Sequence, residues 1–119
     1  MKLEEAIFAK IAPWTDVLLD FDDVVVFKDK YPVTEGHMLF VPKEDTRLLQ
    51  TQALIMAHDY GIKMVDDGVC DAYNVGMNCG ISAGQTVMYP HVHLIPRRRG
   101  DMADPAGGVR HVIPEKGKY

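Results

Sequence analysis

The sequence has little cysteine and no long apolar run, and each shortage excludes a class of protein. Only two cysteines occur in 119 residues. Cys70 and Cys79 are not spaced as a redox or zinc-binding pair, so we expect both to be reduced, packed thiols. No stretch approaches the roughly 20 apolar residues that span a bilayer, which argues against a membrane protein.

The sequence also has no excess of positive charge. The formal net charge is −4, and no basic stripe is present, which argues against binding of nucleic-acid polymers but leaves small anions possible. The first five residues alternate charged and apolar side chains without the apolar core of a secretory signal, so we expect a cytoplasmic protein. The length suits one domain over residues 1–119, with a C-terminal tail from about residue 100.

The hydrophobic pattern predicts an α+β fold with an antiparallel sheet. A short helix is expected over residues 3–11, ended by Pro13, and a longer one from about residue 44 to 65. In the longer segment apolar residues recur at spacings of three and four, which predicts that the helix covers one face of the sheet. The expected strands are 17–19, 24–27, 37–41, 72–77 and about 87–95.

The segment 89–97 carries the strongest chemical signal. Strand geometry places His91 and His93 on one face, because alternate side chains of a strand point the same way. The preceding residues 83–86 supply a glycine turn, an amide and a hydroxyl, which are uncharged donors suited to phosphate oxygens. His37, at the start of an expected strand, offers a third imidazole.

These segments together resemble the histidine triad (HIT) family. The resemblance rests on residues 32–43, on 74–78, on 83–87 leading into 91–97, and on the tail 107–114, and so covers nearly the whole chain. It implies a five-stranded antiparallel sheet with two helices. It also implies a homodimer in which two sheets pair edge to edge, and sites that bind the α-phosphate of purine nucleotides.

The resemblance assigns a role to each candidate residue. His91 is the expected nucleophile, His93 contacts the phosphate oxygens, and His37 supports them from a buried position. A neutral imidazole is a competent nucleophile when an acceptor holds its other nitrogen, and strand geometry can supply a backbone carbonyl. The expected nucleotide-binding residues are Asp29 at the ribose hydroxyls, and Asn78, Gln85 and Thr86 at the phosphate.

The sequence departs from the family pattern at the first histidine of the triad, where Tyr89 stands. In many bacterial relatives that histidine joins three other ligands around a structural zinc ion. The matching positions here are Ala6, Ala9, Asp45 and Tyr89, which do not form a tetrahedral nitrogen and sulfur site. We therefore predict neither a metal nor another cofactor. Packing of Ile7, Phe8 and Ile11 is expected to anchor the N-terminal helix instead.

Pro90 separates Tyr89 from His91 and cannot donate to a sheet ladder. Regular pairing is therefore expected only at or after His91. Tyr89 should lie on the same face as His91 and pack where the zinc site would be, because a phenol is a poor base at neutral pH.

The predicted function is hydrolysis at the α-phosphate of purine nucleotide conjugates, either dinucleoside polyphosphates or nucleoside phosphoramidates, through a nucleotidyl-histidine intermediate. His93 favours hydrolysis, because the related galactose-1-phosphate uridylyltransferases carry glutamine there. Three alternatives stay open: a nucleotidyltransferase or phosphorylase, a nucleotide-binding signalling module with incidental catalysis, and a metal enzyme that adds His37 to the His-x-His pair.

Overall fold

Five strands form one antiparallel sheet in the computed structural model, which describes residues 1–118. The strand order across the sheet is β1-β2-β3-β5-β4, and all neighbours are antiparallel, as the sequence predicts. The strands are β1 Val17–Asp20, β2 Val24–Lys28, β3 Met38–Pro42, β4 Ala72–Gly76 and β5 Val92–Arg97.

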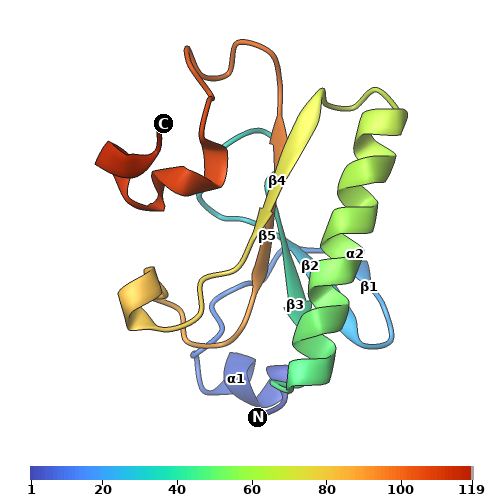
Figure 1. Cartoon of the computed structure of the whole chain (residues 1–119). Helices are drawn as coiled ribbons and strands as arrows, with labels where there is room; N and C mark the ends of the chain where they lie inside the picture. The colour runs from blue at the N-terminus through green and yellow to red at the C-terminus, as the bar shows by residue number, and fades with distance from the viewer. Residues whose placement is uncertain (119) are drawn as a thin grey trace.

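Two α-helices and three short 3-10 turns complete the described chain. Helix α1 spans Leu3–Phe8 and α2 spans Arg47–Asp66, while the turns are η1 Ile81–Ala83, η2 Gly108–Val112 and η3 Pro114–Lys116. Figure 1 shows α2 on one side of the sheet and the C-terminal turns on the other. Neither helix in residues 1–118 combines the length and the apolarity needed to cross a membrane.

The face of the sheet under α2 is closed by small helix residues. Ala53, Ala57 and Gly61 are buried against the sheet, so the helix approaches it closely. A Cβ on Gly61 would lie 2.5 Å from the Tyr73 ring of β4, which explains the glycine. The strand residues buried on this face are Val24, Val26, Phe40, Val92 and Leu94.

The opposite face carries a second core near the N-terminus. It contains Leu3 and Ala6 of α1, the segment before β1, and residues of β2, β3 and the approach to β5. The expected anchors Ile7, Phe8 and Ile11 are wrong, because all three are exposed, Phe8 at 90%. Helix α1 is held instead by its buried side chains and by backbone pairing of residues 2 and 3 with residues 43 and 44.

Two further expectations need correction. Strand β5 begins at Val92 rather than near residue 87, because Pro90 has no N–H to donate; the narrower expectation of a ladder starting at or after His91 is confirmed. Cys70 is buried as expected, but Cys79 is exposed in the loop after β4, so only one of the two thiols is packed.

Candidate active site

Strand β5 and the residue just before it present two histidines on the face of the sheet away from α2. Val92 and Leu94 are fully buried under the helix, and His91 and His93 alternate with them and are half-buried. His93 pairs with Leu39 of β3 on one side and with Gly76 of β4 on the other. The backbone of His93 is thus paired with a strand on each side, in the interior of the sheet.

The ring of His91 is held by the backbone carbonyl that the sequence argument anticipated. Its Nδ1 lies 2.8 Å from the oxygen of Tyr89. A carbonyl oxygen only accepts hydrogen bonds, so Nδ1 carries the proton of the neutral ring. The Nε2 lone pair of His91 is therefore available for attack.

A chain of hydrogen bonds fixes the tautomer of His93 in the same way. The N–H of Val33 donates to His37 Nδ1 over 3.1 Å, so the proton of a neutral His37 sits on Nε2. That Nε2 lies 2.9 Å from His93 Nδ1, which accepts the hydrogen bond. His93 consequently carries its own proton on Nε2, where it is a donor rather than a base.

Both supporting histidines are neutral at pH 7. Burial lowers the pKa of His93 to about 4, and the nearby rings of His91 and His37 lower it further, against the carboxylate of Asp29. Burial likewise lowers the pKa of His37, and Asp29 opposes the shift. These pKa shifts stabilise the neutral donor and acceptor pattern over a wide pH range.

Asp29 stands at the end of β2, next to the start of β3. Its backbone N–H donates to the carbonyl of His37 over 3.1 Å, and its Oδ1 accepts from the N–H of Tyr31 over 2.7 Å. Its Oδ2 lies 3.4 Å from His37 Nε2. Gly36 makes the tight entry to His37 with φ of +88°, a conformation that favours glycine. The structure thus joins Asp29 to the histidines.

The other three expected residues lie in the segment between β4 and β5, outside that hydrogen-bonded chain. Gln85 accepts from the N–H of Gly80 over 2.8 Å and donates to the carbonyl of Val87 over 3.1 Å, so its amide braces this loop. Asn78 and Thr86 are exposed. Asn78 and Gln85 line a hollow of about 210 Å³ beside Pro90.

Sequence reasoning missed Trp14. This indole is buried, and its ring centroid lies 4.9 Å from that of His91. Trp14 precedes β1 and is remote in sequence from the histidines, so no spacing rule points to it. Its status as the only tryptophan in the chain was the one available signal.

The residues at the family's zinc positions do not fit a zinc ion. Ala6 has no ligand atom and is fully buried. The hydroxyl of Tyr89 donates to the carbonyl of Pro42 over 2.7 Å, and Asp45 accepts from the amide of Gln50 over 2.8 Å. Burial raises the pKa of Tyr89 above its usual range. The phenol therefore fills this space as a packed hydrogen-bond donor.

Within residues 1–118, one cluster of three side chains offers ligand atoms for a metal. Asp29, His37 and His93 each offer one such atom, and all lie within 4.8 Å of one another. The imidazole atoms in this group already bond to each other, as described above, and a metal ion would have to displace that hydrogen bond.

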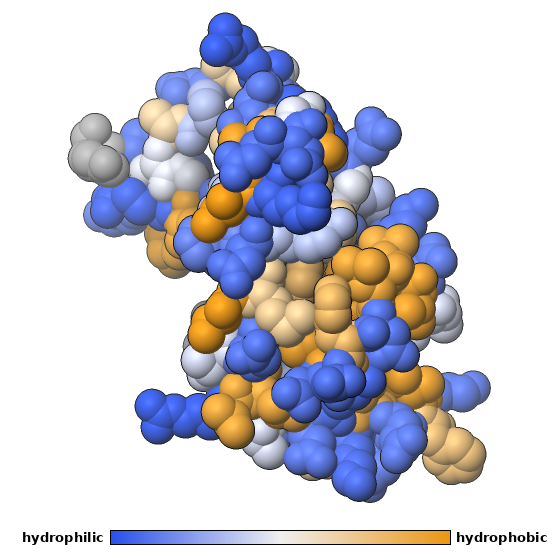
Figure 2. Space-filling model, turned by 90° about the vertical axis from the view of Figure 1, so that its right-hand side faces the viewer, coloured by the Kyte–Doolittle hydropathy of each residue, from blue (hydrophilic) through white to orange (hydrophobic). Residues whose placement is uncertain are grey.

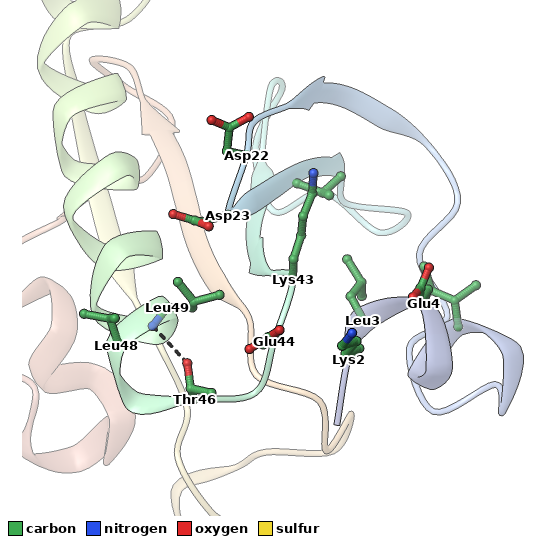
Figure 3. Close-up of a pocket in the computed structure, with 12 residues that line it drawn as sticks. Lys2, Leu3, Glu4, Asp22, Asp23, Lys43, Glu44, Thr46, Leu48 and Leu49 are labelled. Carbon is green, nitrogen blue, oxygen red and sulfur yellow. Dashed lines mark hydrogen bonds between the residues drawn. The ribbon is translucent and has the colours of Figure 1, made fainter.

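Another hollow lies away from the histidines. It measures about 750 Å³ and opens between α1, the β1–β2 turn and the start of α2, as Figure 3 shows. Leu3 and Leu49 are among its apolar lining residues, and four carboxylates stand around it against two lysines. An acidic rim disfavours phosphate binding, so the histidine face remains the candidate site.

The family comparison agrees with this arrangement. The HIT domain model matches residues 13–100, which is about three quarters of the chain. The protein therefore belongs to the HIT domain family.

Similar curated proteins include characterised and uncharacterised members. A HIT-like protein of Saccharolobus solfataricus is 31% identical over 76% of this chain and 72% of its own length. The bis(5'-nucleosyl)-tetraphosphatase of Schizosaccharomyces pombe is 29% identical over 66% of this chain, and an adenylylsulfatase of Arabidopsis thaliana is 26% identical over 71%. The chain spans 47% and 46% of the length of these last two proteins.

Solved structures share the fold. A zinc-bound histidine triad family protein from Mycobacterium smegmatis superposes with a TM-score of 0.67 and 28% identity, over 83% of this chain and 76% of that one. The likeness in backbone extends to a protein that holds zinc, although the residues at the zinc positions of this chain do not form a set of zinc ligands.

Proposed function

We propose that the protein hydrolyses purine nucleotide conjugates at the α-phosphate through a covalent nucleotidyl group on His91. The observation that carries this proposal is the bond from His91 Nδ1 to the carbonyl of Tyr89. This hydrogen bond directs the Nε2 lone pair of His91 away from the carbonyl, and the ring is half-buried rather than enclosed. A neutral imidazole held in one tautomer is an activated nucleophile.

The reaction proceeds in two displacements. His91 Nε2 forms a bond to the α-phosphorus, and the bond to the leaving group breaks, so that the leaving group takes the electron pair. The ring then carries a positive charge, and its Nδ1–H still donates to the Tyr89 carbonyl. Water attacks the phosphorus in the second step, loses a proton to solvent, and returns the electron pair to Nε2, which releases a nucleoside monophosphate.

The neighbouring groups stabilise the phosphoryl charge in this proposal. The Nε2 proton of His93 donates to a phosphate oxygen, and His37 holds it in that tautomer. Asp29 accepts from the ribose hydroxyls. Asn78 and Thr86 are proposed as further phosphate donors, and Gln85 joins them if its amide exchanges a loop bond for the ligand.

The relatives support the substrate class. A tetraphosphatase and an adenylylsulfatase are among the matched proteins, and both names denote nucleotide conjugates as substrates. Their activities are transferred to this chain only as a proposal, because the chain spans less than half of either protein.

The test is to trap the intermediate. The purified protein is mixed separately with diadenosine tetraphosphate, adenosine 5'-phosphosulfate and an adenosine phosphoramidate, quenched within milliseconds, and mapped by mass spectrometry. We expect one adenylyl group on His91 and release of adenosine monophosphate. His91→Ala should give neither, whereas His58→Ala, on the other side of the sheet, should give both. An adenylyl group on any other residue contradicts the proposal.

We also propose a homodimer that pairs the β4 edges of two sheets. The other edge strand, β1, is interrupted by a bulge between Val17 and Leu19, which disfavours pairing, whereas β4 pairs regularly. Helix α2 packs beside β4 and exposes Ile55 and Ile62. Figure 2, from the side of α2 and β1, shows apolar side chains at the surface among charged ones.

Sedimentation tests this assembly. Ile55→Glu combined with Ile62→Glu should convert a dimer at micromolar concentration into a monomer. The matched control is Val17→Glu combined with Leu18→Glu on β1, which introduces the same two charges at similarly exposed positions, 53% and 46% against 51% for Ile55 and 43% for Ile62. Loss of the dimer in the control, or a wild-type monomer, contradicts the proposed interface.

A further inference from the structure

Trp14 lies directly against the proposed nucleophile. It is the only tryptophan in the chain and is 6% exposed. Its ring centroid is 4.9 Å from that of His91, with 55° between the planes. Its ring centroid also lies 6.0 Å from that of Phe27 and 6.5 Å from that of Tyr89, so these two rings hold the indole in place.

The contacts around His91 restrict its ring in complementary ways. The hydrogen bond to the Tyr89 carbonyl holds one atom, Nδ1, and by itself permits the ring to swing about that atom. His93 flanks the ring at a centroid distance of 5.2 Å in an edge-on arrangement. Trp14 provides an aromatic surface from another part of the chain, and it removes the remaining rotation.

Trp14 also contacts the His91 ring in the state in which that ring is cationic. The imidazole of His91 is neutral before attack and cationic once Nε2 is bonded to phosphorus. An aromatic ring within about 6 Å of a cation attracts it through the ring quadrupole. A buried indole at 4.9 Å therefore favours the nucleotidylated state over the free one.

We propose that Trp14 is a positioning residue for nucleotidyl transfer, which holds the His91 ring for attack and stabilises its cationic, nucleotidylated form. This inference rests on the proposed function. Its chemistry requires an aromatic ring at this position.

Kinetics of three variants test the role. Trp14→Leu keeps an apolar side chain but removes the ring, and it should lower kcat about tenfold with KM within about twofold. Trp14→Phe restores an aromatic ring and should recover kcat to within about threefold of wild type. Phe27→Leu, in the same aromatic cluster, is the control for lost packing and should keep kcat within about twofold. The role is overturned if Trp14→Leu loses no more kcat than Phe27→Leu.

Fluorescence gives a second readout that does not depend on turnover. The emission of an indole depends on the groups that cover it. The ring of His91 lies against Trp14 at a centroid distance of 4.9 Å, so the emission of Trp14 should depend on whether that ring is present.

At pH 7 and without substrate, His91→Ala should uncover the indole and shift its emission to longer wavelength, whereas His58→Ala on α2 should leave the emission unchanged. An unchanged emission in His91→Ala overturns the contact between the two rings. If the wild type forms no adenylyl adduct, the proposed function fails, and the fluorescence comparison still decides whether Trp14 responds to His91.

Discussion

The two faces of β5 differ in every physical respect although they alternate along one strand. On the α2 side Val92 and Leu94 are fully buried among aliphatic and aromatic residues. On the other side His91 and His93 are half-buried and connected by hydrogen bonds to backbone and to His37. The comparison shows how a dry, close-packed face fixes the backbone from which the reactive face projects.

The largest effects should separate these two faces by single substitutions on the same strand. We expect His91→Ala to lower kcat by several orders of magnitude with little change in the free energy of unfolding. Leu94→Ala should lower the free energy of unfolding by about 2–5 kcal/mol, because it leaves a cavity, while folded molecules keep their activity. Urea titration measures the free energy of unfolding of each variant, and kcat per folded molecule measures its activity. The comparison breaks if either variant shows the profile of the other.

The closeness of α2 to the sheet is tested at Gly61. A Cβ there would lie 2.5 Å from the Tyr73 ring, so Gly61→Ala should lower the free energy of unfolding by about 1–3 kcal/mol through overpacking. Gly68→Ala is the control for the conformational cost of glycine, since open space surrounds it, although its φ of +73° also strains alanine. Equal stability of wild type and Gly61→Ala would show that the helix stands further from the sheet.

Burial of His93 on the reactive face should make the free energy of unfolding depend on pH. Because the folded-state pKa of His93 is about 4 and its ordinary value is 6.5, only the unfolded chain binds the proton between these values. The free energy of unfolding should therefore decrease as pH falls from about 6.5 to about 4, with no contribution above pH 7. His93→Gln should flatten this decrease, leaving the part due to His37. Melting temperatures at pH 7 and 4.5 for both proteins test this, and equal slopes contradict it.

Tyr89 connects the reactive face to the N-terminal core, and its loss should affect stability more than rate. Tyr89→Phe removes the hydrogen bond to the buried carbonyl of Pro42 and should lower the free energy of unfolding by about 1–2 kcal/mol. The rate should stay within about tenfold, since the backbone carbonyl that holds His91 is unchanged. A fall in rate as large as that of His91→Ala would place the hydroxyl in the reaction.

The smallest expected effect concerns metal. Because Ala6, Ala9, Asp45 and Tyr89 replace a zinc ligand set, a chelator should leave the melting temperature unchanged. Elemental analysis of protein purified in metal-free buffer is the direct check, and a stoichiometric zinc ion would contradict the expectation. The same measurement shows whether Asp29, His37 and His93 hold an ion.

Sequence reasoning succeeded where a local rule applies. Period-two alternation predicted the two faces of β5, and the missing N–H of Pro90 predicted the late start of its ladder. Apolar residues at helical spacing predicted that α2 covers one face of the sheet. It failed where burial depends on distant partners. Phe8 is apolar but faces solvent, and Cys79 lies exposed in a loop. The residues next to them in the sequence do not indicate which surface the fold will cover.

By itself the sequence determined the HIT family, the five-stranded sheet and the pair of histidines, because these follow from spacing along one strand or from motifs within a few residues. Only the tertiary structure decided the tautomers of His37 and His93 and the residues that hold the catalytic rings in place. Val33 sets the proton on His37, His37 sets the proton on His93, and Trp14 lies against His91. The last two contacts join segments far apart in the chain, and they exist only once the sheet has paired β2, β3 and β5.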